Sequence, residues 1–172
     1  MSDQPPLELL LSKYFKTKAV QAIQDHPELI EQILPICLTD KPPMCWRAAW
    51  VIRSAVDKND AQLIPYIDRI LQVLPKKEDG HQRELMKLLQ KAELSEDQES
   101  VLYDISVSIW ESVGKQPSVR YVAFENILAM VRKYPDLRNE LEAITQPQYL
   151  NSLSPGIKKG ITKSLAEIES NR

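Results

Sequence analysis

The residues best suited to chemistry in this sequence are two histidines and two cysteines. His26 lies at an expected helix start and His81 in an expected turn, and neither has a second histidine or a cysteine at metal-ligand spacing. Cys37 and Cys45 are separated by seven residues, and without further soft ligands they do not complete a tetrahedral zinc site. We therefore expect no metal site and no cofactor, with His26 at the surface or capping a helix.

The two cysteines flank an expected connection between helices, so a disulfide between them is one interpretation. Two buried free thiols are the other, and free cysteine is among the most often buried residue types. Two thiols in 172 residues do not form the disulfide framework of a secreted domain. The sequence favours reduced, buried cysteines.

Motifs of known catalytic chemistry are missing from the sequence. It has no Gly-rich phosphate loop, no G-x-S-x-G elbow, no H-E-x-x-H pair and no EF-hand pattern, and its four glycines are scattered. Its carboxylates gather near expected helix ends, where they satisfy free N–H groups and complement the helix dipole. An acid/base pair is the alternative, but the pattern predicts a non-enzymatic protein with no catalytic residues.

Two tryptophans stand four positions apart, at Trp46 and Trp50, which places both indoles on one face of a helix. The main apolar stripe of the same segment points elsewhere, at about 100° per residue. This helix therefore has two apolar faces. We expect Trp50 to be buried between helical hairpins, in register with Phe124; an exposed aromatic clamp for a ligand is the alternative, and Trp46 suits it better than Trp50.

Composition describes an ordinary globular chain. Hydrophobic residues make up 43%, and 22 basic against 24 acidic side chains give a net charge of −2. This balance predicts no electrostatic attraction to nucleic acid or to a membrane surface. The apolar runs are far shorter than the about 20 residues of a membrane span, and the start lacks a basic leader, so cytoplasmic residence is expected.

Helical periodicity runs through almost the whole chain, whereas alternating strand patterns and Asn-Gly hairpin turns are absent. We predict an all-α protein. Its helices are expected near 7–13, 17–25, 28–38, 43–57, 60–74, 81–92, 96–113, 117–133, 136–144 and 155–170.

Internal repetition indicates how these helices are organised. The segments DHPELIEQIL, KNDAQLIPYIDRIL and KYPDLRNELEAI share a polar start and apolar positions in register, and EDQESVLYDISVSIW supplies a fourth copy. The first apolar positions are spaced by 34, 38 and 36 residues, at Leu29, Leu63, Val101 and Leu137. The helices between them offer Pro, then a basic residue, then small residues, with Arg47, Arg120 and Lys159 at the basic position.

A helical hairpin of this period, with Pro, then Arg or Lys, then Ala, resembles the HEAT repeat and its armadillo relatives. WRAAWVI, IPYIDRIL and the closing SPGIKKGITKSLAEI are similar to the small free-standing HEAT-like proteins of bacteria. The resemblance implies a right-handed α-α superhelix of about four to five hairpins, forming one repeat domain over residues 1–172. The hairpin that begins at GHQRELMKLL departs from the pattern, because it lacks the Pro and the Ala.

Arg120 differs from the other charged residues because it falls inside an apolar arc. That arc consists of Ala123, Ile127, Met130 and Val131. A buried guanidinium needs a carboxylate or carbonyl partner, so we expect Arg120 to be paired and structural.

In HEAT-like arrays the second helix of each hairpin lines the concave side, where partners usually bind. The resemblance therefore implies a partner-binding strip of outward residues at Tyr66, Arg69, Tyr103 and Trp110. Tyr, Trp and Arg are the residue types that dominate protein interfaces. The alternative is that these side chains fill the ridges between hairpins.

The leading functional hypothesis is an interaction or scaffold module that binds a protein or peptide on its concave face. One rival is a nucleic-acid-binding protein resembling the HEAT-type alkylpurine DNA glycosylases, but the chain is short for that family and its net charge is negative. A third class is an accessory subunit of a cofactor or pigment lyase, which the sequence leaves open.

Overall fold

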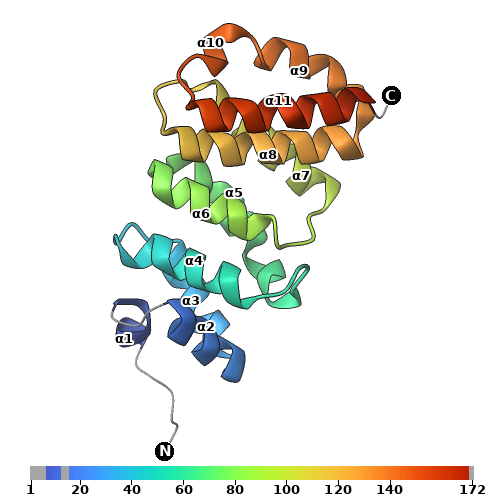
Figure 1. Cartoon of the computed structure of the whole chain (residues 1–172). Helices are drawn as coiled ribbons and strands as arrows, with labels where there is room; N and C mark the ends of the chain where they lie inside the picture. Colours follow the sequence, from blue (N-terminus) through green and yellow to red (C-terminus); the bar gives the residue numbers. More distant parts are fainter. Residues whose placement is uncertain (1–6, 13–15, 171–172) are drawn as a thin grey trace, which may run out of the picture. The chain divides into compact units, whose positions relative to one another are not determined.

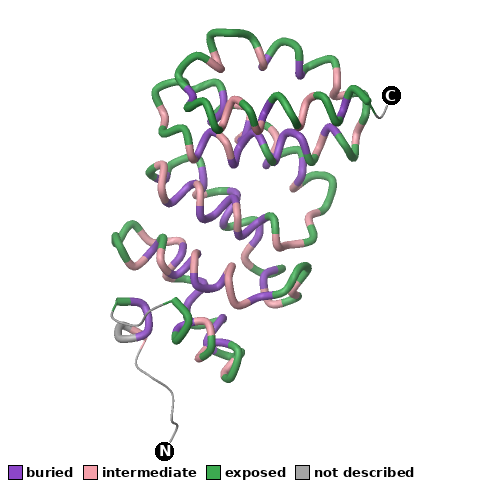
Figure 2. Tube along the Cα trace, in the orientation of Figure 1, coloured by how far each residue is buried: buried purple, intermediate pink, exposed green. Residues whose placement is uncertain are grey.

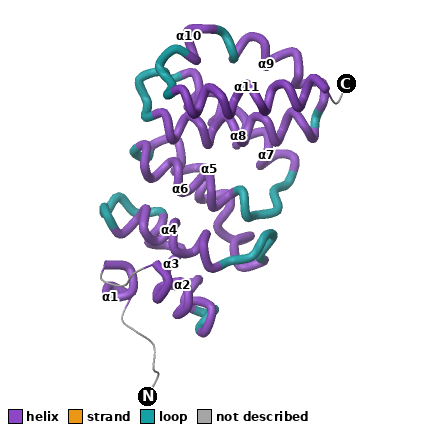
Figure 3. Tube along the Cα trace, in the orientation of Figure 1, coloured by secondary structure: helices purple, strands orange, loops and turns teal. Residues whose placement is uncertain are grey.

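The computed structural model describes residues 7–12 and 16–170, and every regular element among them is helical (Figures 1 and 3). The α-helices are α1 Leu7–Ser12, α2 Lys16–Asp25, α3 Leu29–Cys37, α4 Met44–Ala55, α5 Ile67–Val73, α6 Asp79–Leu89, α7 Glu96–Glu111, α8 Pro117–Lys133, α9 Arg138–Ile144, α10 Pro147–Leu150 and α11 Pro155–Ser170. Short 3-10 helices occur at Ala61–Tyr66, Leu74–Lys76 and Pro135–Leu137. The predicted all-α fold class is confirmed.

The predicted helices correspond closely to those observed, with three informative differences. The segment expected as one helix over 60–74 begins as a 3-10 helix containing Pro65, and α5 starts only after it. The expected start at 81 is wrong, because α6 begins at Asp79 and already contains His81. The short α10 was not predicted, and position 13 of the first expected helix lies outside the described residues.

The chain divides into two compact units, Met1–Gln98 and Glu99–Arg172. The first contains α1 to α6 with the start of α7, and the second contains the rest of α7 with α8 to α11. A single repeat domain over residues 1–172 stays a prediction.

In the first unit, α4 is the helix against which four others pack. It contacts α1, α2, α3 and α6. Its buried residues are Cys45, Ala48, Ala49, Val51 and Ile52. Figure 2 shows the burial along the chain trace. Small residues such as Ala48 and Ala49 allow neighbouring helices to approach closely, and contacts with several helices explain why one apolar stripe is not enough.

Neither tryptophan of α4 is fully buried, although the sequence predicted burial for Trp50. Trp50 is only half-buried, and the Lys16 ammonium lies 5.0 Å from the centroid of its ring. The prediction that Trp50 is buried between hairpins is therefore not met: Trp50 lies at the edge of the core, where a cation covers it. Its expected counterpart Phe124 is fully buried. Trp46 is 37% exposed and is therefore the more exposed of the two, as the sequence predicted.

The core of the second unit is centred on α8, which contacts α11 and is joined to α7 by ring stacking. The rings of Trp110 and Phe124 lie 4.6 Å apart between centroids, and both side chains are fully buried. The Trp110 Nε1–H donates to the carbonyl of Ile144 at the end of α9 over 2.7 Å. Trp110 thus links α7, α8 and α9.

Arg120 lies at the centre of this core, and the prediction that it is buried and paired is confirmed. Its relative exposure is 0%, and its guanidinium lies over the Trp110 ring at 4.8 Å. It donates to the carbonyl of Trp110 (2.8 Å), the hydroxyl of Ser152 (2.8 Å) and the carbonyl of Tyr149 (2.6 Å). One side chain therefore satisfies groups at the end of α7 and around α10.

Replacing this guanidinium should be strongly destabilising. Arg120→Ala leaves two carbonyl partners without a donor and opens a cavity in the core, so we expect the free energy of unfolding to fall by about 3 kcal/mol or more. Urea unfolding followed by circular dichroism measures this. The matched control is Arg132→Ala on the same helix, where the exposed guanidinium is 3.9 Å from Glu167 and its loss should cost less than about 0.5 kcal/mol. Equal effects of the two substitutions would contradict the assigned role of Arg120.

Candidate interaction sites

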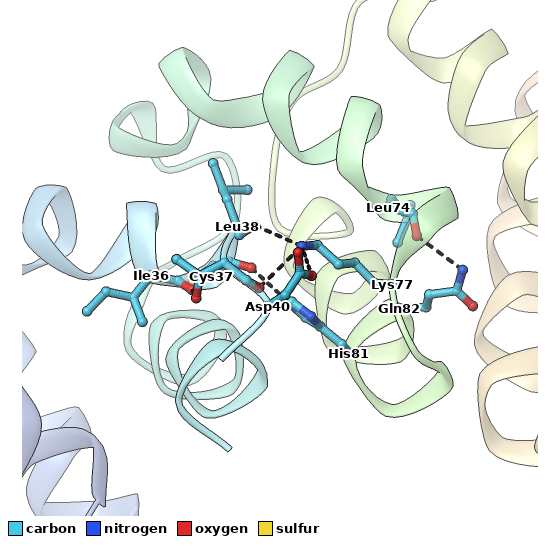
Figure 4. A network of polar contacts seen from close by, with 9 residues as sticks. Ile36, Cys37, Leu38, Asp40, Leu74, Lys77, His81 and Gln82 are labelled. Carbon is cyan, nitrogen blue, oxygen red and sulfur yellow. Dashed lines mark hydrogen bonds and ion pairs between the residues drawn. The ribbon is translucent and has the colours of Figure 1, made fainter. Parts of the chain in front are cut away.

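In the first unit, a buried lysine holds the connection between α3 and α4 against the start of α6 (Figure 4). The Lys77 Nζ donates to the carbonyls of Leu38 (2.8 Å) and Thr39 (3.2 Å) and to Asp40 Oδ1 (2.5 Å). An ammonium has three protons, and all three are used. The hydrogen bond from Lys77 lowers the pKa of the Asp40 carboxyl.

His81 reinforces the same junction from α6. Its Nε2 lies 2.7 Å from the carbonyl of Cys37, and since a carbonyl only accepts, Nε2 carries the proton. Burial lowers the pKa of His81, and the nearby Lys77 ammonium acts in the same direction. His81 is therefore a neutral, buried part of the junction, which corrects the expectation of a histidine in a turn.

A pocket of about 600 Å³ opens beside this junction. Trp46 lines it, and the other lining residues are Asp40, Pro42, Cys45, Lys76, Lys77, Glu78, Gly80 and His81. The sequence raised Trp46 as one member of a ligand clamp, whereas Lys77 and His81 had no assigned role. The structure brings these three side chains to one cavity.

Both cysteines are buried free thiols, as the sequence favoured. Burial raises the pKa of Cys37, so this thiol stays protonated at neutral pH and is a poor nucleophile. Within the described part of the chain, no group of three or more His, Cys, Asp or Glu side chains is placed to hold a metal ion.

In the second unit, an open groove of about 480 Å³ runs along α7. Its walls are Tyr103, Asp104, Val107, Ser108, Glu111 and Ser112 from α7, with Glu140 from α9. The Tyr103 hydroxyl donates to Glu140 Oε2 over 2.5 Å, and the Tyr149 hydroxyl lies 3.5 Å from Glu111 Oε1. Partial burial and the hydrogen bond to Glu140 raise the pKa of Tyr103.

The four residues of the predicted strip have different environments. Trp110 is fully buried in the second unit, so the prediction that it projects outward is wrong, because its indole fills the core beneath Arg120. Tyr103, in the same unit, lines the groove. In the first unit Arg69 is exposed, and Tyr66 is half-buried with its hydroxyl 3.4 Å from the carbonyl of Glu31. Contact of Tyr66, Arg69 and Tyr103 with a partner stays a prediction.

The buried His81 predicts how stability depends on pH. The pKa of His81 is lower in the folded than in the unfolded chain, so the unfolded chain binds the proton more readily. The free energy of unfolding therefore decreases as the pH is lowered. The fall should begin near the unperturbed value of 6.5 and continue through the lower pKa of the folded state. Urea unfolding at a series of pH values measures it. His81→Gln should flatten the dependence in this range, whereas His26→Gln should retain it; a wild-type chain equally stable across the range would contradict the assignment.

Comparison with protein families agrees with the fold. No helix in the described part of the chain is both long and apolar enough to cross a membrane. No curated protein and no solved structure matches the chain. The model of one family, described as a HEAT repeat domain, matches residues 7–168 and so takes in residues of both units. The chain therefore belongs to the HEAT repeat family, as the period of its hairpins predicted.

Proposed function

We propose that this chain is a non-enzymatic interaction module that binds a protein or peptide partner on the second helices of its hairpins. HEAT repeats are scaffolds whose stacked helices offer extended binding surfaces. The observation that carries the proposal furthest is the groove along α7, because it combines an accessible hollow with the residue types of an interface.

The chemistry of this groove favours a basic segment of the partner. Three carboxylates, Asp104, Glu111 and Glu140, line it without a lysine or arginine among the lining residues. Tyr103 adds an amphipathic ring to the lining, and Val107 adds an apolar side chain. The negative charge of the groove attracts and orients a positively charged segment of the partner. The tyrosine supplies contact area at a small cost in conformational entropy.

The first unit contributes Tyr66 and Arg69 to the proposal. Arg69 is exposed on α5 and forms no ion pair with a described residue, so its guanidinium is available to an acidic group of a partner. Tyr66 precedes it by three residues. Contacts of each unit with the partner are tested separately.

The protein is proposed to act in the cytoplasm. Both cysteines are free thiols in the folded chain, as a reducing compartment maintains them.

The groove proposal is tested by affinity capture from native cells, followed by calorimetry with the purified partner. Asp104→Asn with Glu111→Gln should weaken partner binding by more than about 1 kcal/mol, because charge complementarity is lost. Asp136→Asn is the matched control, since this exposed carboxylate of the second unit does not line the groove. Arg69→Ala and Tyr66→Ala test the first unit in the same assay.

The melting temperature separates binding from folding. The groove variants should leave it almost unchanged, because both carboxylates are exposed. A partner that binds the groove variants and the wild-type chain equally would overturn the groove assignment. A loss of stability as large as that of a core substitution would show that these side chains are packing residues.

The nucleic-acid alternative makes a different prediction. With a net charge of −2 and an acidic groove, the chain should not shift duplex DNA at micromolar concentration in about 0.1 M salt. An electrophoretic mobility assay over a range of salt concentrations measures this. A tight complex that weakens steeply with salt would favour the alternative resembling the DNA glycosylases.

A further inference from the structure

The pocket beside Trp46 presents an unused hydrogen-bond donor and an unused acceptor in one cavity. We propose that it is a second binding site, which takes a neutral, extended peptide segment whose backbone N–H bonds to His81 and whose apolar side chain lies on the Trp46 ring. The inference rests on the proposed interaction role for the class of partner, but it concerns a site in the first unit that does not share residues with the groove along α7.

The acceptor is Nδ1 of His81. His81 as a whole residue is only 5% exposed, and its Nε2–H is already bonded to the carbonyl of Cys37. In the neutral ring the other nitrogen keeps a lone pair, and it has no partner among the described residues. Nδ1 is not among the fully enclosed polar atoms that lack a partner, and His81 lines the pocket, so a ligand in the pocket can donate an N–H to this nitrogen.

The donor and the apolar platform are both supplied by Trp46. It is the most exposed of the three tryptophans, since Trp50 is half-buried beneath Lys16 and Trp110 is fully buried. Its indole N–H has no partner among the described residues. An exposed tryptophan at the mouth of a cavity is the residue type most often found at the energetic centre of an interface. A peptide unit offers both the carbonyl that this N–H needs and the N–H that His81 needs.

The charges in the pocket favour a neutral ligand. Lys77 and Asp40 neutralise each other, and Lys76 and Glu78 add one charge of each sign. The start of α6 attracts anions in principle, but Glu78 is its N-cap and Asp79 lies in its first turn, so negative charge is already present there. The pocket therefore has no excess positive charge to bind a phosphate or a nucleotide. A neutral amide group does not require such charge.

The size and rigidity of the pocket suit a short segment of chain. A volume of about 600 Å³ lies within the range of typical ligand sites. A Cβ built on Gly80 meets no atom within 4 Å, so there is open space beside this backbone for a ligand to approach closely. The three hydrogen bonds of Lys77 hold the facing walls together, which reduces the entropic cost of binding.

The test uses the full chain and a displayed library of random 12-residue peptides, with selection on the wild-type protein alone, after which the affinity of each selected peptide is measured for the wild type and for Trp46→Ala. Peptides that bind the pocket should lose at least about tenfold in affinity for Trp46→Ala, as expected for a central interface tryptophan. Trp46→Phe keeps a ring but removes the N–H, so its loss should be smaller. Trp50→Phe is the matched control on the same helix and should bind like the wild type. Circular dichroism verifies that each variant is folded.

Nuclear magnetic resonance then identifies the chemistry of the ligand. A selected peptide should shift the indole resonance that disappears in Trp46→Phe, and it should lower the pKa of His81, because a donor to Nδ1 stabilises the neutral ring. Inorganic phosphate and uridine monophosphate are the competing probes, and an anion bound there would raise that pKa. Selected peptides that bind Trp46→Ala as tightly as the wild type, or a raised pKa with phosphate but no response to peptides, would overturn the inference. Either result leaves the groove proposal standing, because that proposal is measured with Asp104 and Glu111 variants and the native partner.

Discussion

A helical hairpin of about 35 residues cannot bury both apolar faces of its inner helix by itself, and this constraint determines the rest of the structure. The inner helix of the first unit, α4, contacts α1, α2, α3 and α6. Its small residues are buried, while Trp50 lies beneath Lys16 of α2. The inner helix of the second unit, α8, is buried along most of its length for the same reason. Neighbouring hairpins are therefore a condition of stability for each hairpin.

Such packing creates a second problem, because helix ends carry carbonyls without intrahelical partners and the hairpins bring those ends into the interior. Both units solve it with a buried basic side chain from a neighbouring helix or turn. Arg120 donates to the carbonyl of Trp110, in the last turn of α7, while Lys77 and His81 donate to carbonyls at the end of α3. The cationic Arg120 and Lys77 also complement the negative end of the helix dipole, whereas the neutral His81 contributes a hydrogen bond alone. The basic residues that mark the interior of this chain are structural for that reason.

The sequence predicted those features that depend on local pattern. Helix positions and the period of the hairpins follow from apolar spacing, and the burial of Arg120 follows from its place within an apolar arc. The assignment of individual aromatics was less successful, since Trp110 is buried and Trp50 is not fully buried. Spacing along a helix tells which residues share a face, but not which neighbour covers that face. The junction of Lys77 and His81 with residues 37–40 joins segments about one repeat apart, and no periodicity within either segment indicates it.

The same reasoning separates residues that hold the fold from residues that are available to a partner. Lys77 uses all three of its protons within the protein and has no donor left for a ligand, and Arg120 is fully buried with three of its N–H groups bonded to neighbouring segments. His81 is different, because the carbonyl of Cys37 uses only one of its two nitrogens. Trp46 is different as well, because its ring is exposed at the pocket instead of covered by a cation or a core. The interior polar groups of this protein bond to helix ends. Side chains that keep a free donor or acceptor are therefore the favoured positions for binding a ligand. A count of donors and acceptors identifies them, whereas a sequence motif does not.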